Sequence, residues 1–211
     1  MKNGLRKVFT LCVGVVFFTS CIAKKHYVNQ VIKKETIEEL ASKTVVVTVA
    51  DNVDLKDFKK TYKKNFSDDK VFAKSYTDAI SIALKNNRVF SSVQIGKVNN
   101  WDFLKENSTT DYIIDIPFFE INNRIETTRV VTGGPNNFGG MQTTSTEYCV
   151  VNVKVVLYDM KKKKRVLEFL STGESSVFFF DFTKALQKAK ERSITHIVNY
   201  LKSGKTEYDK Y

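Results

Sequence analysis

The sequence has few of the residues from which catalytic and metal sites are usually built. Its 211 residues include only two histidines and three cysteines. No histidine, cysteine and carboxylate spacing typical of a zinc site occurs. Neither a phosphate-binding P-loop motif nor a G-x-S-x-G nucleophile elbow is present. The sequence therefore predicts a protein that is not an enzyme and that needs neither a metal nor a cofactor.

The shortage of cysteine also excludes a disulfide framework. Cys12 lies in the amino-terminal segment and Cys21 directly after it, so Cys149 has no partner in the rest of the chain. Cys149 lies among valines and is expected to be a buried small hydrophobic residue rather than a reactive thiol. His196 lies on the apolar face of a predicted helix, so we expect a core or boundary histidine. A Cys149–His196 dyad is the weaker interpretation.

The amino-terminal apolar stretch is too short to cross a membrane as a helix. It runs from residue 8 to residue 18, whereas a membrane-spanning helix needs roughly 20 residues. Lys2, Arg6 and Lys7 precede it, and Thr19-Ser20-Cys21 follows it. A basic start, an apolar middle and a small-residue end are typical of a signal peptide, which we assign to residues 1–20.

Residues 18–21 resemble the lipobox of bacterial lipoproteins, although Phe18 replaces the usual leucine. The resemblance implies that the leader is cut before Cys21 and that this cysteine carries acyl chains, palmitate among them, as a membrane anchor. An ordinary secreted protein with an incidental cysteine is the alternative. No aspartate follows Cys21 at the next position, which favours the outer membrane, facing the periplasm. Inner-membrane and surface-exposed anchoring stay open.

The chain carries a formal net charge of +11, but its cations are scattered along the sequence. No aromatic-interleaved basic groove or nucleic-acid-binding motif accompanies them. An exported protein also does not normally meet nucleic acid. We therefore expect a mixed-charge surface and no nucleic-acid binding.

Hydrophobic periodicity predicts a tether at residues 21–42 with at most a weak helix, one α+β domain at residues 43–204, and a polar tail at residues 205–211. The predicted order is strand, helix, strand, an optional short helix, three strands and a helix. A helical connection between the first strands implies a parallel pair, and the last three strands form a meander. The result is a mixed sheet of about five strands, packed by two long helices.

The boundaries of these elements rest on capping and turn residues. The predicted helices begin at Asp68 or Asp69 and at Asp181 or Thr183, because aspartate and threonine cap helix amino termini. Pro117 marks an edge or a bulge in the third strand. The predicted strands are residues 43–50, 89–95, 112–131, 147–157 and 165–177, and the helices end at Asn86-Asn87 and at Gly204.

Three local patterns carry a resemblance to a known domain. They are residues 83–93, residues 110–115, and the hairpin of residues 155–168 with Gly173 beyond it. Together they resemble the domain shared by the TolB amino-terminal region, the lipoprotein activators of penicillin-binding proteins, and the curli-secretion lipoproteins. The resemblance covers residues 43–203. It implies an α+β fold and a role in the cell envelope, and it carries over no functional residue.

This resemblance implies two candidate functions. The first is a membrane-tethered interaction module that binds an envelope protein during cell-envelope assembly or maintenance. The second is a subunit of an outer-membrane secretion pore, like the curli exporter. The hairpin at residues 119–148 is long enough to span, but charge on a lipid-facing strand costs ~2–4 kcal/mol at the midplane. Asn123, Thr127, Arg129, Gln142 and Thr144 lie along this hairpin and favour the interaction module.

Two exposed segments are candidate contact sites. The loop between Thr132 and Gln142 contains four glycines and is longer than a simple turn requires. We expect Asn136, Asn137 and Phe138 to contact a protein partner, with a flexible hairpin end as the alternative. The segment from Lys161 to Lys164 is expected to be a solvated turn, and electrostatic contact with anionic head groups is its second interpretation.

Overall fold

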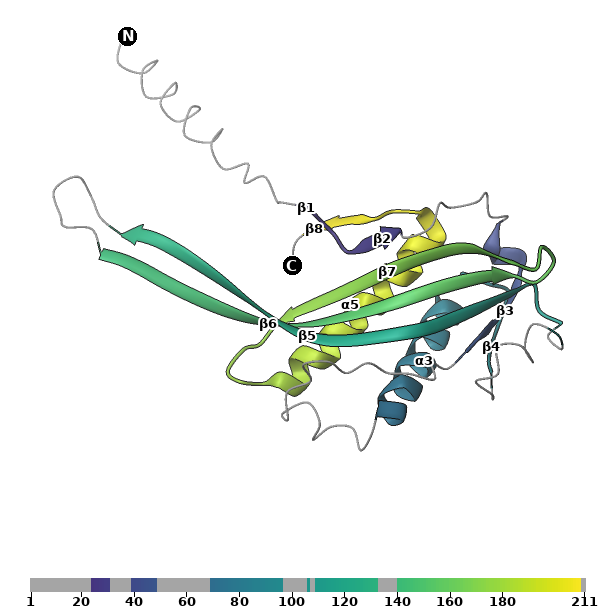
Figure 1. The fold of residues 1–211 in the computed structure, drawn as a ribbon, viewed down its shortest axis with the longest axis horizontal. Coiled ribbons are helices and arrows are strands. Elements are labelled where there is room, and N and C mark those ends of the chain that lie inside the picture. The colour runs from purple at the N-terminus through teal and green to yellow at the C-terminus, as the bar shows by residue number, and fades with distance from the viewer. Residues whose placement is uncertain are drawn as a thin grey trace, which may run out of the picture.

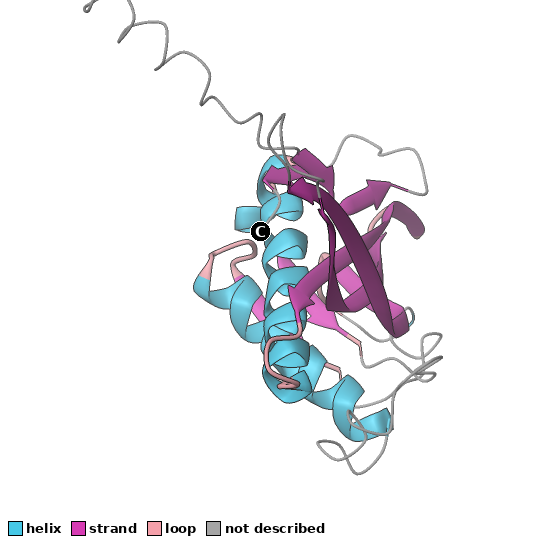
Figure 2. Ribbon diagram, turned by 90° about the vertical axis from the view of Figure 1, so that its left-hand side faces the viewer, coloured by secondary structure: helices cyan, strands magenta, loops and turns pink. Residues whose placement is uncertain are grey.

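The computed structural model describes residues 24–30, 39–48, 69–96, 106, 109–132 and 140–209. In these residues a six-stranded mixed sheet, in the order β2-β7-β6-β5-β3-β4, carries two long helices on one face (Figures 1 and 2). The predicted α+β fold is confirmed. The elements are β1 (Lys24–His26), β2 (Val28–Gln30), η2 (Leu40–Ser42), β3 (Thr44–Val47), α3 (Asp69–Asn86), β4 (Ser92–Ile95), β5 (Tyr112–Thr132), β6 (Gly140–Asp159), β7 (Lys164–Ser176), α5 (Phe182–Ser203) and β8 (Glu207–Asp209).

The predicted parallel pair and meander are both present. Strand β3 runs parallel to β4 and to β5, and α3 lies between β3 and β4 in the chain. Strands β5, β6 and β7 form the antiparallel meander. Val45, Val46 and Val47 of β3 are all buried, as expected for a short strand that is covered on both faces.

Pro117 marks a bulge in the pairing of β5 with β6. The register between β5 and β6 shifts between Asp115 and Phe118. The described pairing of β5 with β3 ends at Ile114, three residues before Pro117, so the edge interpretation is not contradicted at this position. Proline lacks the N–H that a ladder needs, which explains why the regular pairing is interrupted there.

The sheet and helices enclose the hydrophobic core. Alternate residues of β6 face the helices and are fully buried, as the sequence predicts: Cys149, Val151, Val153, Val155 and Leu157. From the other side, α3 contributes Phe72, Tyr76 and Ile80, whose rings and methyl groups are also fully buried. The aromatic rings of Tyr76 and Phe119 meet edge to face with centroids 4.7 Å apart.

The predicted ends of α5 are confirmed by its capping contacts. The Asp181 carboxylate accepts a hydrogen bond of 2.9 Å from the backbone N–H of Lys184. At the other end Gly204 adopts a left-handed conformation, with a φ of 68°, and its N–H donates to the carbonyl of Tyr200. These two residues fix the length of the longest helix of the described chain.

Helix α5 packs unusually close to β7. A side chain on Gly173 would collide with the backbone of Ala189 and Ser193 on the helix. Two residues earlier, the Ser171 hydroxyl donates a 2.9 Å hydrogen bond to the Ser193 carbonyl. The strand and the helix therefore meet backbone to backbone, and only small residues fit between them.

The segment before residue 43 differs from the expectation. Residues 24–30, predicted as part of a tether with at most a weak helix, form β1 and β2 instead. Strand β2 pairs with the outer edge of β7, and β1 pairs with β8 in a separate two-stranded sheet. Three-residue strands that pair with distant residues leave no periodic pattern in the sequence, which is why they were missed.

Candidate functional site

The predicted contact residues fall outside the part of the chain that the structure describes. Cys21, the signal peptide, Asn136, Asn137 and Phe138 all lie outside the described residues. Lipidation of Cys21 and partner binding by the loop therefore stay predictions. The structure does describe the two strands that support this loop, and they form the most distinctive surface feature of the protein.

These strands form a projecting hairpin that we call the arm, defined as residues 125–132 of β5 and 140–147 of β6. The last pair between β6 and β7 joins Tyr148 to Ser176, and among the described strands β5 and β6 pair only with each other beyond it. Figure 1 shows the arm extending well past both helices. It is therefore a two-stranded ribbon, and neither α3 nor α5 packs on it.

Both faces of the arm are mainly polar. The register places Thr127 opposite Ser145 on one face and Glu126 opposite Thr146 on the other. All residues from Thr127 to Val130 and from Gln142 to Thr146 are exposed. Among the arm residues whose side chains the structure describes, two apolar residues interrupt this pattern, Ile125 at 67% and Val130 at 47% exposure. The arm thus presents mixed contact chemistry rather than one hydrophobic face.

An ion-pair cluster fixes the base of the arm. The Arg124 guanidinium lies 3.1 Å from the Glu126 carboxylate and 3.0 Å from that of Glu174 on β7. It also stacks over the Tyr148 ring, 4.3 Å from its centroid. Burial by itself lowers the pKa of Arg124, but the hydrogen bonds and charges of Glu126 and Glu174 outweigh it, so the pKa is raised overall. This permanent cation joins three strands where the arm leaves the sheet.

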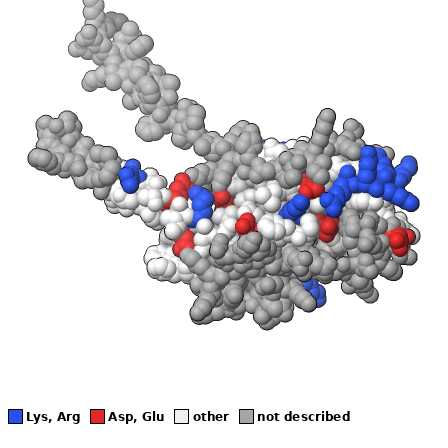
Figure 3. Space-filling view, viewed as in Figure 1, with Lys and Arg blue, Asp and Glu red and all other residues white. Residues whose placement is uncertain are grey.

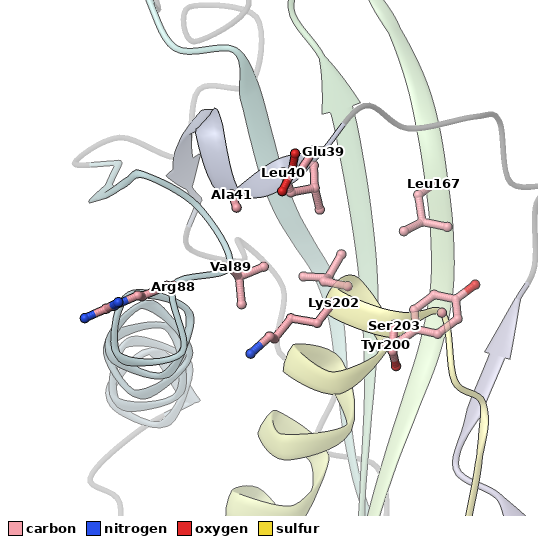
Figure 4. Close-up of a pocket in the computed structure, with 11 residues that line it drawn as sticks. Glu39, Leu40, Ala41, Arg88, Val89, Leu167, Tyr200, Lys202 and Ser203 are labelled. Carbon is pink, nitrogen blue, oxygen red and sulfur yellow. The ribbon is translucent and has the colours of Figure 1, made fainter.

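A cavity of about 430 Å³ opens near the end of α5. Leu40, Val89, Leu167 and Tyr200 form apolar parts of its wall, and Lys202 adds a charge. In Figure 4, Leu40 and Val89 point toward this space, whereas the Arg88 side chain extends away from it. Its lining contains neither histidine nor cysteine, and it offers a recess of mixed polar and apolar character for a small group.

Cys149 and His196 have the structural roles that the sequence predicts. Cys149 is fully buried on the helix-facing side of β6. His196 is also fully buried, its Nδ1 lies 2.7 Å from the Thr172 carbonyl, and its ring stacks on Tyr27. Burial lowers the pKa of His196 to about 4, against the effect of the Thr172 hydrogen bond. The imidazole is therefore neutral at physiological pH, with its Nδ1–H donated to Thr172.

The Lys161–Lys164 turn lies at the opposite end of the sheet from the arm. Its four lysines are exposed and form the blue cluster at the right of Figure 3. The Lys162 ammonium lies 3.7 Å from the Asp159 carboxylate, whose other oxygen accepts the Lys162 backbone N–H at 2.8 Å. Asp159 thus shapes the turn, in agreement with the predicted solvated turn.

One exposed feature was missed by the sequence analysis. Phe178, Phe179 and Phe180, here called the Phe loop, join β7 to α5 and are 73%, 82% and 86% exposed. Beside the loop lies a groove of about 570 Å³, whose lining includes Lys184, Lys188 and Arg192 of α5. The signal was present in the sequence, because three consecutive phenylalanines directly precede the helix-capping Asp181.

Within the described residues, no group of histidine, cysteine and acidic side chains could hold a metal ion. No helix in that part of the chain is long and apolar enough to cross a membrane.

No protein-family model matches the sequence, and no curated protein matches it. Among solved structures, the PelC dodecamer from Paraburkholderia phytofirmans is similar with a TM-score of 0.46 and 10% identity, covering 85% of this chain and 96% of that one. A protein described as a neuraminyllactose-binding hemagglutinin homolog from Helicobacter pylori has a TM-score of 0.44 and 13% identity, covering 82% and 89%. A minor lipoprotein from Acinetobacter baumannii has a TM-score of 0.38 and 12% identity, covering 78% and 96%. One of these neighbours is thus itself described as a lipoprotein, and none of them assigns a family to this chain.

Proposed function

We propose that the protein is a lipid-anchored, non-catalytic interaction module that binds another protein of the bacterial cell envelope. The acyl chains on Cys21 hold it at the outer membrane, facing the periplasm, and the arm carries the contact surface. The observation that supports this proposal is the length of the arm. Its strands continue past the last pairing with β7 at Tyr148, although a short turn at that point would have connected β5 to β6.

The chemistry of the arm suits a protein partner. Its exposed threonines, serine and glutamine supply hydrogen-bonding groups, and Ile125 and Val130 supply separate apolar contacts. A ribbon that projects beyond the core can also offer the edge of a strand to an extended segment of the partner. Polar and charged side chains on both faces favour this role over the secretion pore, because charge facing lipid is costly.

The test of the arm is affinity capture from envelope extract with two versions of the full-length protein. In the first, residues 127–145 are replaced by an Asn-Gly turn between Glu126 and Thr146, which pair directly across the hairpin. No core residue changes, so we expect the fold to persist and the partner to be lost. The matched control replaces Lys161 and Lys163 by alanine at the far end of the sheet and should retain the partner.

Phe138→Ala tests the predicted anchor residue in the same experiment and should weaken capture. An unchanged set of captured proteins with the shortened arm would refute the role of the arm. The anchor is tested separately by Cys21→Ala, which should remove the protein from the membrane fraction and change its electrophoretic mobility. Unchanged partition and mobility would refute lipidation.

A further inference from the structure

The Phe loop exposes more aromatic surface than a folded domain normally leaves in water. Its three side chains are consecutive, and each is at least 73% exposed. Phe178 and Phe179 touch only edge to face, with ring centroids 4.3 Å apart. Scattered exposed apolar residues are common, but a contiguous projecting aromatic cluster indicates a contact surface.

The backbone holds the loop in a strained conformation. Phe179 and Phe180 have φ values of 47° and 60°, a left-handed region that bulky residues rarely adopt. Hydrogen bonds fix the loop at both ends: the Val177 N–H donates to the Glu147 carbonyl, and the Asp181 N–H to the Phe178 carbonyl. Glycine would fit this backbone better, and the core gains nothing from these rings. The phenylalanines therefore serve an external contact.

Cations line the surface directly behind the loop. Lys184, Lys188 and Arg192 are spaced by four residues, which places them on one face of α5. All three line the groove that Phe178 and Phe179 border. Asp181 is the acidic residue of this lining, and its carboxylate is engaged in capping the helix. Aromatic rings thus lie in front of a surface with an excess of positive charge.

We infer that the Phe loop inserts into the interface of a lipid bilayer that contains anionic lipids. The three rings enter the boundary between head groups and acyl chains, and Lys184 and Lys188 bind the phosphates of the surrounding head groups. This inference goes beyond the proposed function, because it assigns a second membrane contact that does not depend on Cys21.

The chemistry favours a bilayer over a protein partner at this loop. Protein-binding hot spots are enriched in tryptophan, tyrosine and arginine and are centred in flat or pocketed patches. The Phe loop instead projects from the end of the sheet and consists of rings without polar groups. Phenylalanine next to lysine is the pairing typical of interfacial membrane segments.

The test measures local insertion in the full-length protein. Trp101, which lies outside the described residues, is the only tryptophan of the chain. Replacing it by phenylalanine and introducing Phe179→Trp gives one fluorophore in the loop, with a ring that suits the same backbone. The protein is mixed with vesicles of phosphatidylcholine and phosphatidylglycerol whose acyl chains are brominated. If Trp101→Phe lowers the unfolding midpoint, Trp101 is kept, and the emission spectrum of the wild-type protein is subtracted from that of the Phe179→Trp protein.

We expect the emission of the Phe179→Trp protein to shift to the blue and to be quenched by the brominated chains. Vesicles of phosphatidylcholine alone, or the added changes Lys184→Glu and Lys188→Glu, should abolish most of this quenching. The matched control is Ile82→Trp in the same background, because Ile82 is 58% exposed on α3 and should stay unquenched.

The Cys21→Ala protein should give the same loop signal, which separates this inference from the proposed lipid anchor. If the emission maximum of the Phe179→Trp protein with anionic vesicles equals that in buffer alone, the inference is overturned and the loop is left to a protein partner. Equal quenching at position 82 would overturn it as well, since it would show general adsorption rather than insertion of the loop.

Discussion

The Tyr27 ring stacks on the His196 imidazole, with centroids 4.8 Å apart and planes inclined by 18°. Tyr27 lies in the short connection between β1 and β2, and His196 lies in the last long helix. The Tyr27 carbonyl also accepts a 2.7 Å hydrogen bond from the Thr172 N–H. The Thr172 carbonyl in turn accepts the hydrogen bond from the His196 Nδ1. One amino-terminal residue thus joins a strand and a helix that are far away in sequence.

We predict that Tyr27→Ala lowers the free energy of unfolding by about 3–5 kcal/mol, because it empties a fully enclosed aromatic site. Tyr27→Phe is the control and should lose much less, since it keeps the stacked ring. Urea unfolding followed by circular dichroism measures both. Equal stability of wild type and Tyr27→Ala would show that the amino-terminal strands do not belong to the cooperative unit.

The same contact predicts where the folding unit begins. A chain of residues 24–209 should be more stable than a chain of residues 43–204, because only the longer one contains β2 and the Tyr27 ring. Strand β2 also protects the outer edge of β7, which would otherwise be an open template for aggregation. Thermal unfolding and light scattering of the two chains distinguish these effects. A higher midpoint for the shorter chain would contradict this prediction.

His196 should make stability depend on pH. Its pKa is near 6.5 in an unfolded chain and about 4 in the folded protein, so the unfolded state binds the proton first as the pH falls. We therefore expect the free energy of unfolding to decrease from pH 6.5 to pH 4, by up to roughly 3 kcal/mol at 1.36 kcal/mol per pH unit. Arg192, whose positive charge also disfavours the imidazolium, acts in the same direction.

The measurement is denaturant unfolding at half-unit steps between pH 7 and pH 4. In His196→Gln the slope over this window should flatten, whatever the absolute stability of the variant. A slope in the variant equal to that of the wild type would assign the pH dependence to other groups.

Gly173→Ala should be destabilising by about 1–3 kcal/mol or more, because the new methyl group would force the backbone of α5 away from β7. Ser171→Ala provides the matched control on the same strand and face. It adds no volume and removes only the hydrogen bond to Ser193, which should cost about 1 kcal/mol. Chemical denaturation of both variants compares steric and hydrogen-bond contributions. A smaller loss for Gly173→Ala than for Ser171→Ala would refute the close approach.

Phe180→Gly should increase stability while it removes one ring from the Phe loop. A left-handed backbone costs a non-glycine residue about 1–2 kcal/mol, and glycine removes this cost. The greater conformational freedom of glycine in the unfolded chain cancels about half of the gain. The net gain should be about 0.5–1 kcal/mol, since the 86% exposed ring contributes little packing. Phe178→Gly is the control without this relief, because Phe178 is not among the residues with positive φ. Thermal midpoints that fall for Phe180→Gly would contradict the strain.

The sequence predicts those parts of the fold whose hydrophobic pattern or capping chemistry is local. The alternation around Cys149 identifies the buried face of β6, and Asp181 and Gly204 identify both ends of α5. Pro117 identifies the bulge in β5 because a missing N–H acts at one known position. Each of these signals depends on neighbouring residues alone.

The missed features depend on partners that are distant in sequence. The polar stretch from Gln142 to Thr146 extends β6 beyond the predicted start at residue 147, because the opposite strand of the arm supplies its hydrogen bonds. A ribbon with two solvated faces has no buried side that could give an alternating pattern. The candidate contact at the Phe loop was missed for another reason: the three phenylalanines before Asp181 stand out in the sequence, but the sequence does not show whether an apolar run is buried or exposed.

Strand β7 carries the Phe loop at one end and the Lys161–Lys164 turn at the other. Its 13 residues, at about 3.3 Å each, separate these ends by roughly 40 Å. That length is about five times the distance over which physiological salt screens a surface charge. The head groups that surround the Phe loop therefore do not act on these lysines through the solvent. The two ends of β7 can thus make separate charge contacts, and neither end alters the electrostatics of the other.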